Sequence, residues 1–279
     1  MRTPLPAAAL AALFLAGLAA AAQTPPPGPY VPPPSPGPYE PVRRDPVGTR
    51  LVNSATPYPV GARKVEVLFT HRFRQSIRDS TSHDLWGLDS GADVGIGLTL
   101  GATPHLDLSL YRASFQEDFE LAGKFLFLDQ ADRVPLTISV RAGADLLRRP
   151  GVVDTDRPFV QLLLARRLAR GVNFLVSPSW VSDTPRLADA FNVPIGLTFP
   201  LPGQRLVELE YVPANRDLDD SRAAWHVAVS KALGGHIFEV VFGNSRATTV
   251  DQILGGDSAA GFETKDIRLG FNLVRYFPF

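Results

Sequence analysis

The sequence predicts an all-β protein: a closed, antiparallel, up-and-down transmembrane β-barrel of about twelve strands. Three observations predict it. Apolar and polar residues alternate with period two in twelve segments, the connections between these segments are mostly long and short in turn, and the sequence after the last segment stops on an aromatic residue, Phe279. An even strand count with short turns at one end and long loops at the other is typical of bacterial outer-membrane barrels.

The composition excludes several other classes of protein. The chain has 279 residues, with 28 basic and 28 acidic side chains, and a net charge of zero argues against a nucleic-acid partner. It has no cysteine, which excludes disulfides, thiol nucleophiles and thiolate metal sites. His105 and Asp107 share a strand face beside a turn and are interpreted as a polar pair at the rim rather than a metal site, so no metal site and no cofactor are expected.

The first 22 residues are typical of an export signal. Arg2 provides a positive charge, Ala7 to Ala19 form a short apolar stretch, and three alanines precede Gln23. The alternative is a membrane anchor, for which this apolar stretch is short. We expect residues 1–22 to be a signal peptide that is cleaved near Ala22, and the mature protein to be exported to the bacterial outer membrane.

Residues 23–60 are predicted to be a proline-rich periplasmic tether. Ten of the 18 residues from 24 to 41 are proline, a composition that favours extended polyproline II structure. The simpler interpretation is that this segment is a spacer without a binding role. The functional alternative is that it docks to a periplasmic partner. The barrel domain is then expected to span residues 61–279.

The strands follow from the alternation. On the segment from 93 to 101, for example, large apolar residues occupy one parity and glycine or threonine the other. The expected strands are residues 64–73, 93–101, 105–113, 118–127, 135–144, 158–168, 172–181, 191–199, 205–212, 222–231, 236–243 and 266–277. Pro135, Pro178 and Pro194 are placed toward strand ends, and a single helical turn is expected around residues 250–254.

Two bands of aromatic residues favour lipid contact over a soluble β-sandwich, in which the polar parity would simply face water. The band expected at the loop end consists of Phe119, Trp180, Phe191, Tyr211 and Trp225, and the band at the turn end of Phe127, Phe174, Phe199, Phe238 and Phe277. Outer-membrane lipid is therefore an expected partner.

The opposite parity carries charge in mid-strand, which is expected to face a lumen. The candidate lumen residues are Lys64, Glu66, Asp107, Glu120, Lys124, Arg141, Glu208, Glu210, His226, Glu239 and Arg268. These residues can line a polar, weakly cation-favouring channel or form a salt-bridged network that fills the lumen. The loop at 244–265 can fold inward as a constriction or stay outside as a lid.

The C-terminal strand resembles the assembly signal of outer-membrane proteins, an alternating amphipathic strand with a terminal aromatic residue. This resemblance implies recognition by the barrel-assembly machinery. Its departures are Arg275, which lies on the lipid-facing parity, and Pro278. The residues that carry the resemblance are Leu269, Phe271, Leu273, Phe277 and Phe279.

Several stretches together resemble an uncharacterised bacterial family of outer-membrane β-barrel proteins of unknown function, over residues 63–277. The resemblance implies the fold and the outer-membrane location but no activity. It is carried by Thr70-His71-Arg72-Phe73, Leu85-Trp86-Gly87-Leu88-Asp89, the hairpin from Gly91 to Leu110 with Tyr111-Arg112, and the loop from Asn244-Ser245 to Gln252.

The function predicted first is a pore or binding barrel for small polar solutes. The alternative is an occluded structural barrel that anchors an envelope assembly, and a lipid-modifying enzyme is a third class. Outer-membrane lipid hydrolases place a histidine and a serine two residues apart on a strand, and none of the strand histidines here has that partner; His226 and Ser230 lie four apart. No catalytic residues are expected.

Overall fold

The computed structural model describes residues 48–279 except 149–150, 152, 186–187, 216–217, 219–220 and 256–265. The expected signal peptide (1–22) and the part of the expected tether up to residue 47 lie outside the described residues. Within them, no helix is both long and apolar enough to cross a membrane.

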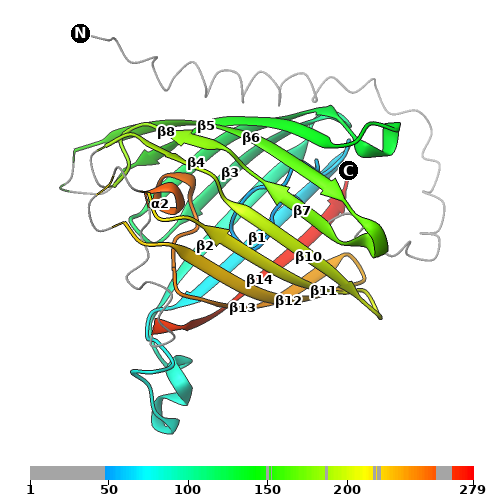
Figure 1. Ribbon diagram of the computed structural model, residues 1–279. Helices are drawn as coiled ribbons and strands as arrows, with labels where there is room; N and C mark the ends of the chain where they lie inside the picture. The colour runs from blue at the N-terminus through cyan, green and yellow to red at the C-terminus, as the bar shows by residue number, and fades with distance from the viewer. Residues whose placement is uncertain are drawn as a thin grey trace, which may run out of the picture. The chain divides into compact units, whose positions relative to one another are not determined.

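The described residues form a closed barrel of twelve antiparallel strands (Figure 1). The first strand pairs with the second on one side and with the last on the other, and this pairing closes the ring. The segments are β1 Lys64–Phe73, β2 Ala92–Gly101, β3 Leu106–Ala113, β4 Asp118–Leu128, β5 Thr137–Leu147, β6 Thr155–Arg167, β7 Asn173–Val176, β8 Ser179–Val181, β9 Ala190–Asn192, β10 Ile195–Leu201, β11 Arg205–Val212, β12 Ala224–Leu233, β13 His236–Gly243 and β14 Arg268–Pro278.

Two of the twelve strands are interrupted by proline, which lacks the N–H of a ladder residue. Pro178 separates β7 from β8, and Pro194 separates β9 from β10. The proline carbonyls still take part in pairing, since Pro178 O accepts from Leu162 N and Pro194 O from Ser177 N, each at 2.9 Å. The fourteen segments are therefore twelve strands, as the sequence predicts.

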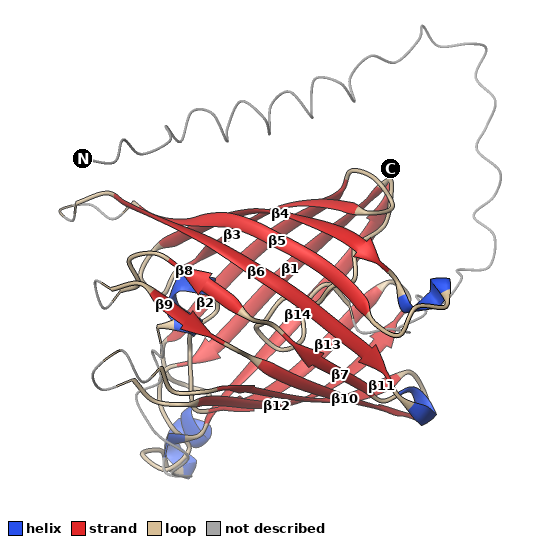
Figure 2. Ribbon diagram, turned by 45° about the horizontal axis from the view of Figure 1, so that its top comes forward, coloured by secondary structure: helices blue, strands red, loops and turns tan. Residues whose placement is uncertain are grey.

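The two ends of the barrel differ as expected (Figure 2). At the turn end, where β1 begins and β14 finishes, connections are short, as in the two-residue turn Gly234-Gly235. Both glycines have positive φ (52° and 82°), which glycine adopts without strain and which matches the twist of a hairpin. At the loop end most connections are longer; the exceptions are residues 114–117 and residues 148–154, the second of which is no longer than the turn-end connection 129–136.

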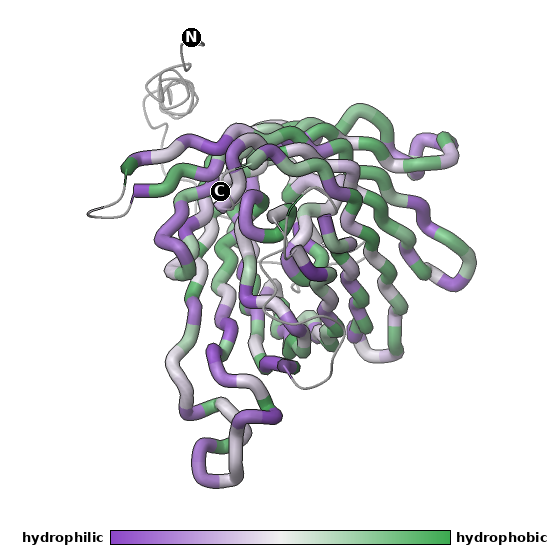
Figure 3. Tube along the Cα trace, turned by 60° about the vertical axis from the view of Figure 1, so that its left-hand side comes forward, coloured by the Kyte–Doolittle hydropathy of each residue, from purple (hydrophilic) through white to green (hydrophobic). Residues whose placement is uncertain are grey.

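Alternate residues face lipid and lumen. Outward side chains are apolar and remain exposed on the barrel wall, for example Ile96 at 59% and Phe127 at 58%, whereas inward ones are mostly small or polar. Figure 3 shows hydrophobic and hydrophilic residues alternating along the strands. The strand register brings residues of the loop-end aromatic band side by side on neighbouring strands. Trp180 pairs with Phe191, and Tyr211 pairs with Trp225.

The helical segments are short. Three 3₁₀ segments lie in connections: η1 Ser82–Gly87, η2 Gln130–Asp132 and η3 Ala169–Gly171. The α-helix α2 Val250–Leu254 occupies the single turn expected there.

The described part of the chain differs from the expected domain boundary at residue 61. Residues 48–60, which were assigned to the tether, lie inside the barrel and contact wall residues from β1, β4, β11 and other strands. Their side chains are largely buried, and Thr56 has no exposed surface. The barrel unit therefore begins by about residue 48.

Candidate functional site

Residues 48–60 form a re-entrant segment, here called the lumen hairpin. Gly48 lies beside Tyr276 at the turn end, and Val60 leads back to β1 at the same end. Between them the chain turns in the lumen, where Leu51 N donates to Ser54 O and Thr56 N to Thr49 O, both at 2.9 Å. The hairpin therefore enters and leaves through the turn end.

The base of the lumen hairpin is held by charged residues of the wall. Thr49 Oγ1 donates to the Glu66 carboxylate at 2.5 and 2.7 Å, and Val60 N donates to the Asp107 carboxylate at 3.1 Å. Lys124 pairs with Asp107 at 3.2 Å. Its remaining protons reach the hairpin carbonyls, at 2.6 Å for Tyr58 O and 3.2 Å for Thr56 O.

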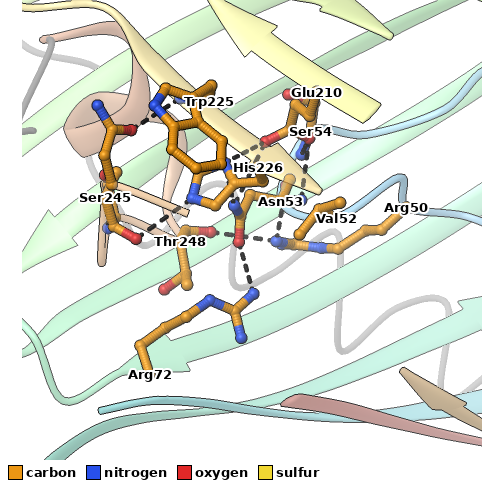
Figure 4. A network of polar contacts seen from close by, with 12 residues as sticks. Arg50, Val52, Asn53, Ser54, Arg72, Glu210, Trp225, His226, Ser245 and Thr248 are labelled. Atoms are coloured by element: carbon orange, nitrogen blue, oxygen red, sulfur yellow. Dashed lines mark hydrogen bonds and ion pairs between the residues drawn. The ribbon is translucent and has the colours of Figure 1, made fainter. Parts of the chain in front are cut away.

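The tip of the hairpin is bound by a second network (Figure 4). Glu210 on β11 accepts the backbone N–H groups of Asn53 at 3.0 Å and Ser54 at 2.7 Å, and lies 3.3 Å from His226 Nδ1. Arg72 Nη2 donates to the Asn53 side-chain oxygen at 2.8 Å. Hydrogen bonds to an ionised group are among the stronger ones in proteins, so this network fixes the tip in one position.

Arg50 connects the hairpin to the opposite wall. Its guanidinium lies 3.3 Å from Glu120 on β4, a carboxylate that also pairs with Arg141 on β5. The Arg50 guanidinium carbon lies 4.6 Å from the centre of the Tyr111 ring. Both cations share one buried carboxylate, so the charge of the wall is balanced in part by the hairpin.

Apolar packing supplements these polar contacts. Leu51 and Tyr58 form a buried cluster with Ala165, Leu175 and Leu206 of the wall. Gly196 faces Leu51 so closely that an added Cβ would lie 2.3 Å from the Leu51 side chain. A side chain at position 196 would therefore displace the hairpin or its own strand.

The loop after β13 folds inward from the loop end and meets the hairpin. Thr248 O accepts from Arg50 at 3.1 Å, and Val250 N donates to Glu120 at 3.0 Å. Asp251 on α2 pairs with Arg157 on β6, and its N–H donates to Asp145 at 2.9 Å. The described part of the loop, residues 244–255, is thus a constriction rather than an outer lid.

Burial raises the pKa of the Asp251 carboxyl, while the Thr249 hydroxyl and the Arg157 guanidinium act in the opposite direction. The Thr249 hydroxyl donates to one carboxylate oxygen of Asp251 at 2.7 Å, and Arg157 contacts the other. Burial outweighs both, so the pKa of the Asp251 carboxyl lies above its usual value, and the Arg157 guanidinium limits that rise.

The structure places most of the candidate lumen residues together. Two of the expected lumen residues, Lys64 and Arg268, do not lie in the lumen. Lys64 is exposed at the turn end. Arg268 lies at the rim of the loop end and donates to the carbonyls of Arg74 and Asp266. The candidates that are buried and inward-facing, each at most 6% exposed, are Glu66, Asp107, Glu120, Lys124, Arg141, Glu208, Glu210, His226 and Glu239.

In the C-terminal strand, Leu269, Phe271, Leu273 and Phe277 lie on the outward parity of β14, as expected, and Arg275 shares it, with its guanidinium carbon 5.1 Å from the centre of the Phe277 ring. Phe279 follows the strand and is joined to Arg63 by backbone pairing at 3.0 Å. The described geometry is compatible with the expected assembly signal, and recognition by the assembly machinery stays a prediction.

Sequence reasoning missed several lumen residues. The hairpin itself is the main omission, although Leu51 and Val52 are apolar residues that an exposed tether does not require. The missed wall residues lie within one residue of the loop-end limits of the expected strands, away from mid-strand; they are Arg72, Asp93, Asp118, Asp145 and Arg157.

Little space is left between the described residues of the lumen. A cavity next to Lys124 and Tyr111 has a volume of about 30 Å³, and one between Arg50 and the α2 loop about 10 Å³. The first volume accommodates about two water molecules. Among the described residues, no three His, Asp or Glu side chains are arranged to hold a metal ion.

The model of one family, described as a membrane-bound β-barrel domain (DUF5777), matches residues 47–277. The chain belongs to this family. The match begins at the first residues of the lumen hairpin, so the family's domain includes the hairpin as well as the barrel. No curated protein sequence matches the chain.

The chain is similar to solved outer-membrane barrels at low sequence identity. Outer membrane phospholipase A from Escherichia coli is 12% identical, with a TM-score of 0.42 over 78% of this chain and 91% of that one. OmpT of Vibrio cholerae is 10% identical, with a TM-score of 0.35 over 77% of this chain and 96% of that one. These values concern the fold alone.

The Glu210 network predicts how the hairpin can be released. We expect Glu210→Gln to raise the rate at which a thiol at position 54 (Ser54→Cys) is labelled by a maleimide roughly tenfold to hundredfold. The loss of a charged hydrogen bond costs about 1.5–3 kcal/mol, and the backbone N–H groups of residues 53 and 54 are then poorly paired. The native chain has no cysteine, so the signal comes from this position alone.

The matched control is Glu208→Gln, two residues away on the same strand. Its carboxylate accepts from Ser230 of the wall at 2.7 Å, so labelling should change little. Equal labelling in all three backgrounds would contradict the assigned role of Glu210.

Proposed function

We propose that this protein is an occluded barrel of the bacterial outer membrane that anchors its own N-terminal segment at the periplasmic face. The single observation that carries the proposal is the lumen hairpin, which is bound by wall residues on several sides and fills the space that a solute would need. The proline-rich tether then extends from a fixed point in the barrel.

The location in the outer membrane is supported by the fold and by the lipid-facing residues. An apolar outer surface between two aromatic bands suits a bilayer, and closed barrels of this kind occur in bacterial outer membranes. Cleavage of a signal peptide near Ala22 and recognition of the C-terminal strand by the assembly machinery belong to the same proposal.

The orientation follows from the two ends of the barrel. Short turns face the periplasm in barrels of the bacterial outer membrane, and Gly48 lies at the turn end. Residue 48, where the N-terminal segment joins the barrel, therefore lies at the periplasmic side in this proposal. Binding of a periplasmic partner to the proline-rich segment belongs to the same proposal.

A gated pore for small polar solutes is the second candidate, and one observation favours it. The hairpin is held largely by polar contacts that water can replace, while the strand ladder closes without it. Without the hairpin the wall would present more carboxylates than cations, which favours cationic solutes. In this candidate the resting state is still closed.

A lipid-modifying enzyme has weaker support. His71 on β1 faces outward and stacks on Phe271, with ring centres 4.8 Å apart and planes 11° apart. It also lies edge-on to Phe73. These contacts are those of an aromatic-band residue, and we propose no catalytic residues.

Conductance in planar bilayers tests whether the lumen is closed. We expect the full chain to give no steady conductance, because the hairpin and the α2 loop both fill the lumen. A variant that lacks 48–60 and in which a short glycine-serine linker replaces 245–265 should conduct, since both obstructions are gone. A heat-dependent shift in gel migration would serve as the control that each variant forms a barrel.

Steady conductance of the full chain, similar to that of the double deletion, would contradict the occluded barrel. It would instead support the solute pore.

Protease access tests the anchoring role. We expect a protease site inserted between residues 41 and 47 to resist external protease in intact cells and to be cut after the outer membrane is permeabilised. The same site inserted in the loop-end connection 213–223 should be cut in intact cells and provides the matched control. Cleavage at 41–47 in intact cells would place the N-terminal segment outside the periplasm and overturn the proposal.

A further inference from the structure

The connection between β1 and β2, residues 74–91, forms a projection here called the lateral arm. All three ribbon and tube views show it leaving the loop end of the barrel and pointing sideways, away from the barrel axis, rather than continuing along it (Figures 1–3). Its tip carries large apolar side chains in the open: Leu85 is 53% exposed, Trp86 56% and Leu88 45%.

The tip has a defined internal structure. Thr81 and Asp84 form a capping box, in which Thr81 N donates to the Asp84 carboxylate at 2.7 Å and His83 N to Thr81 Oγ1 at 3.2 Å. Gln75 Nε2 donates to the other Asp84 oxygen, and Trp86 N to Thr81 O, both at 2.9 Å. The tip is therefore fixed by its own hydrogen bonds.

The backbone at the tip is in a conformation that bulky residues disfavour. Leu85 and Trp86 have φ of 51° and 55°, in the left-handed region. The bonds around Asp84 hold them there, and both side chains remain exposed instead of packing against the arm. A strained backbone that displays apolar side chains is typical of a surface that a partner covers.

The position of the arm indicates which partner. The arm starts directly after Phe73, which lies on the lipid-facing parity of β1, and rejoins the barrel at β2, whose outward residue Ile96 is 59% exposed. The arm is thus continuous with the lipid-facing surface. A sideways direction at the loop end runs along the outer leaflet, and tryptophan is enriched at the level of the headgroups.

We propose that the tip of the lateral arm inserts into the outer-leaflet interface of the membrane, with Leu85, Trp86 and Leu88 as the inserted side chains. The inference rests on the outer-membrane location proposed above. The partner is a lipid surface: the indole ring lies at the headgroup boundary and the two leucines reach the upper acyl chains. The arm then acts as a second, peripheral contact with the bilayer beside the barrel wall.

Tryptophan fluorescence tests this proposal, because the chain has three tryptophans and two can be replaced. The full chain with Trp180→Phe and Trp225→Phe, which leaves Trp86, is folded into phosphatidylcholine vesicles. Some of these vesicles carry acyl chains brominated near the headgroup. The matched control retains Trp180, which lies on the lipid-facing wall at the loop end, and carries Trp86→Phe and Trp225→Phe.

We expect brominated lipid to quench Trp86 to an extent similar to Trp180, and aqueous acrylamide to quench it weakly. Disrupting the capping box with Asp84→Ala should reduce the lipid quenching of Trp86 and leave that of Trp180 unchanged in the control chain. Trp86 quenched by acrylamide and not by brominated lipid, with Trp180 still quenched by the lipid, would overturn the proposal while leaving the membrane barrel intact.

Two further outcomes are decisive. If Trp86 is protected from both quenchers and its protection falls as the ratio of lipid to protein rises, a second copy of the chain covers the tip and the lipid proposal fails. If brominated lipid quenches neither Trp86 nor Trp180, the barrel wall does not contact lipid. The outer-membrane location then fails, and the proposal for the arm, which rests on it, fails too.

Discussion

The structure depends on the pairing of buried charge inside the barrel. A closed barrel of twelve strands with a polar inner face places carboxylates where water is scarce, and an unpaired carboxylate there is costly. Glu208 accepts from Ser230 of the wall, whereas Asp107 pairs with Lys124 of the wall and also accepts from Val60 N of the lumen hairpin. Glu210 lies against His226 of the wall and accepts two backbone N–H groups of the hairpin.

The wall and the lumen hairpin therefore satisfy each other's polar groups. Lys124 of the wall donates to two hairpin carbonyls, and Arg50 of the hairpin and Arg141 of the wall both pair with Glu120. Because the α2 loop also donates to Glu120, the two inserted segments meet at one carboxylate. A change at Glu120 should thus affect both obstructions of the lumen, whereas a change at Glu210 concerns the hairpin tip alone.

The strands could be predicted from the sequence because their signal is local. Lipid outside and polar groups inside impose a period of two that is visible within eight residues, so that even the strands broken by Pro178 and Pro194 were identified. The same parity predicts all eleven candidate lumen residues, and nine of them are buried in the lumen. Lys64 and Arg268 share it but lie at opposite ends of the barrel, where a side chain faces the rim.

The lumen hairpin could not be predicted in this way. Its contacts to Glu210 and Lys124 use backbone N–H and C=O groups, which every residue type except proline provides in full, so they leave no pattern in the sequence. Prolines up to Pro59 also made the segment resemble the tether before it. Sequence parity predicts the wall of such a barrel, and the occupant of its lumen depends on contacts far apart in the chain.

Hydrogen exchange of the full chain in detergent or lipid tests the filled lumen most directly, and it needs no substitution. If the hairpin occupies the lumen, the amides of Leu51, Asn53, Ser54 and Thr56 are hydrogen-bonded and should exchange as slowly as those of strand β11. Exchange of these amides at the rate of an unstructured peptide, with β11 still protected, would show that the hairpin does not occupy the lumen and would contradict the occluded barrel.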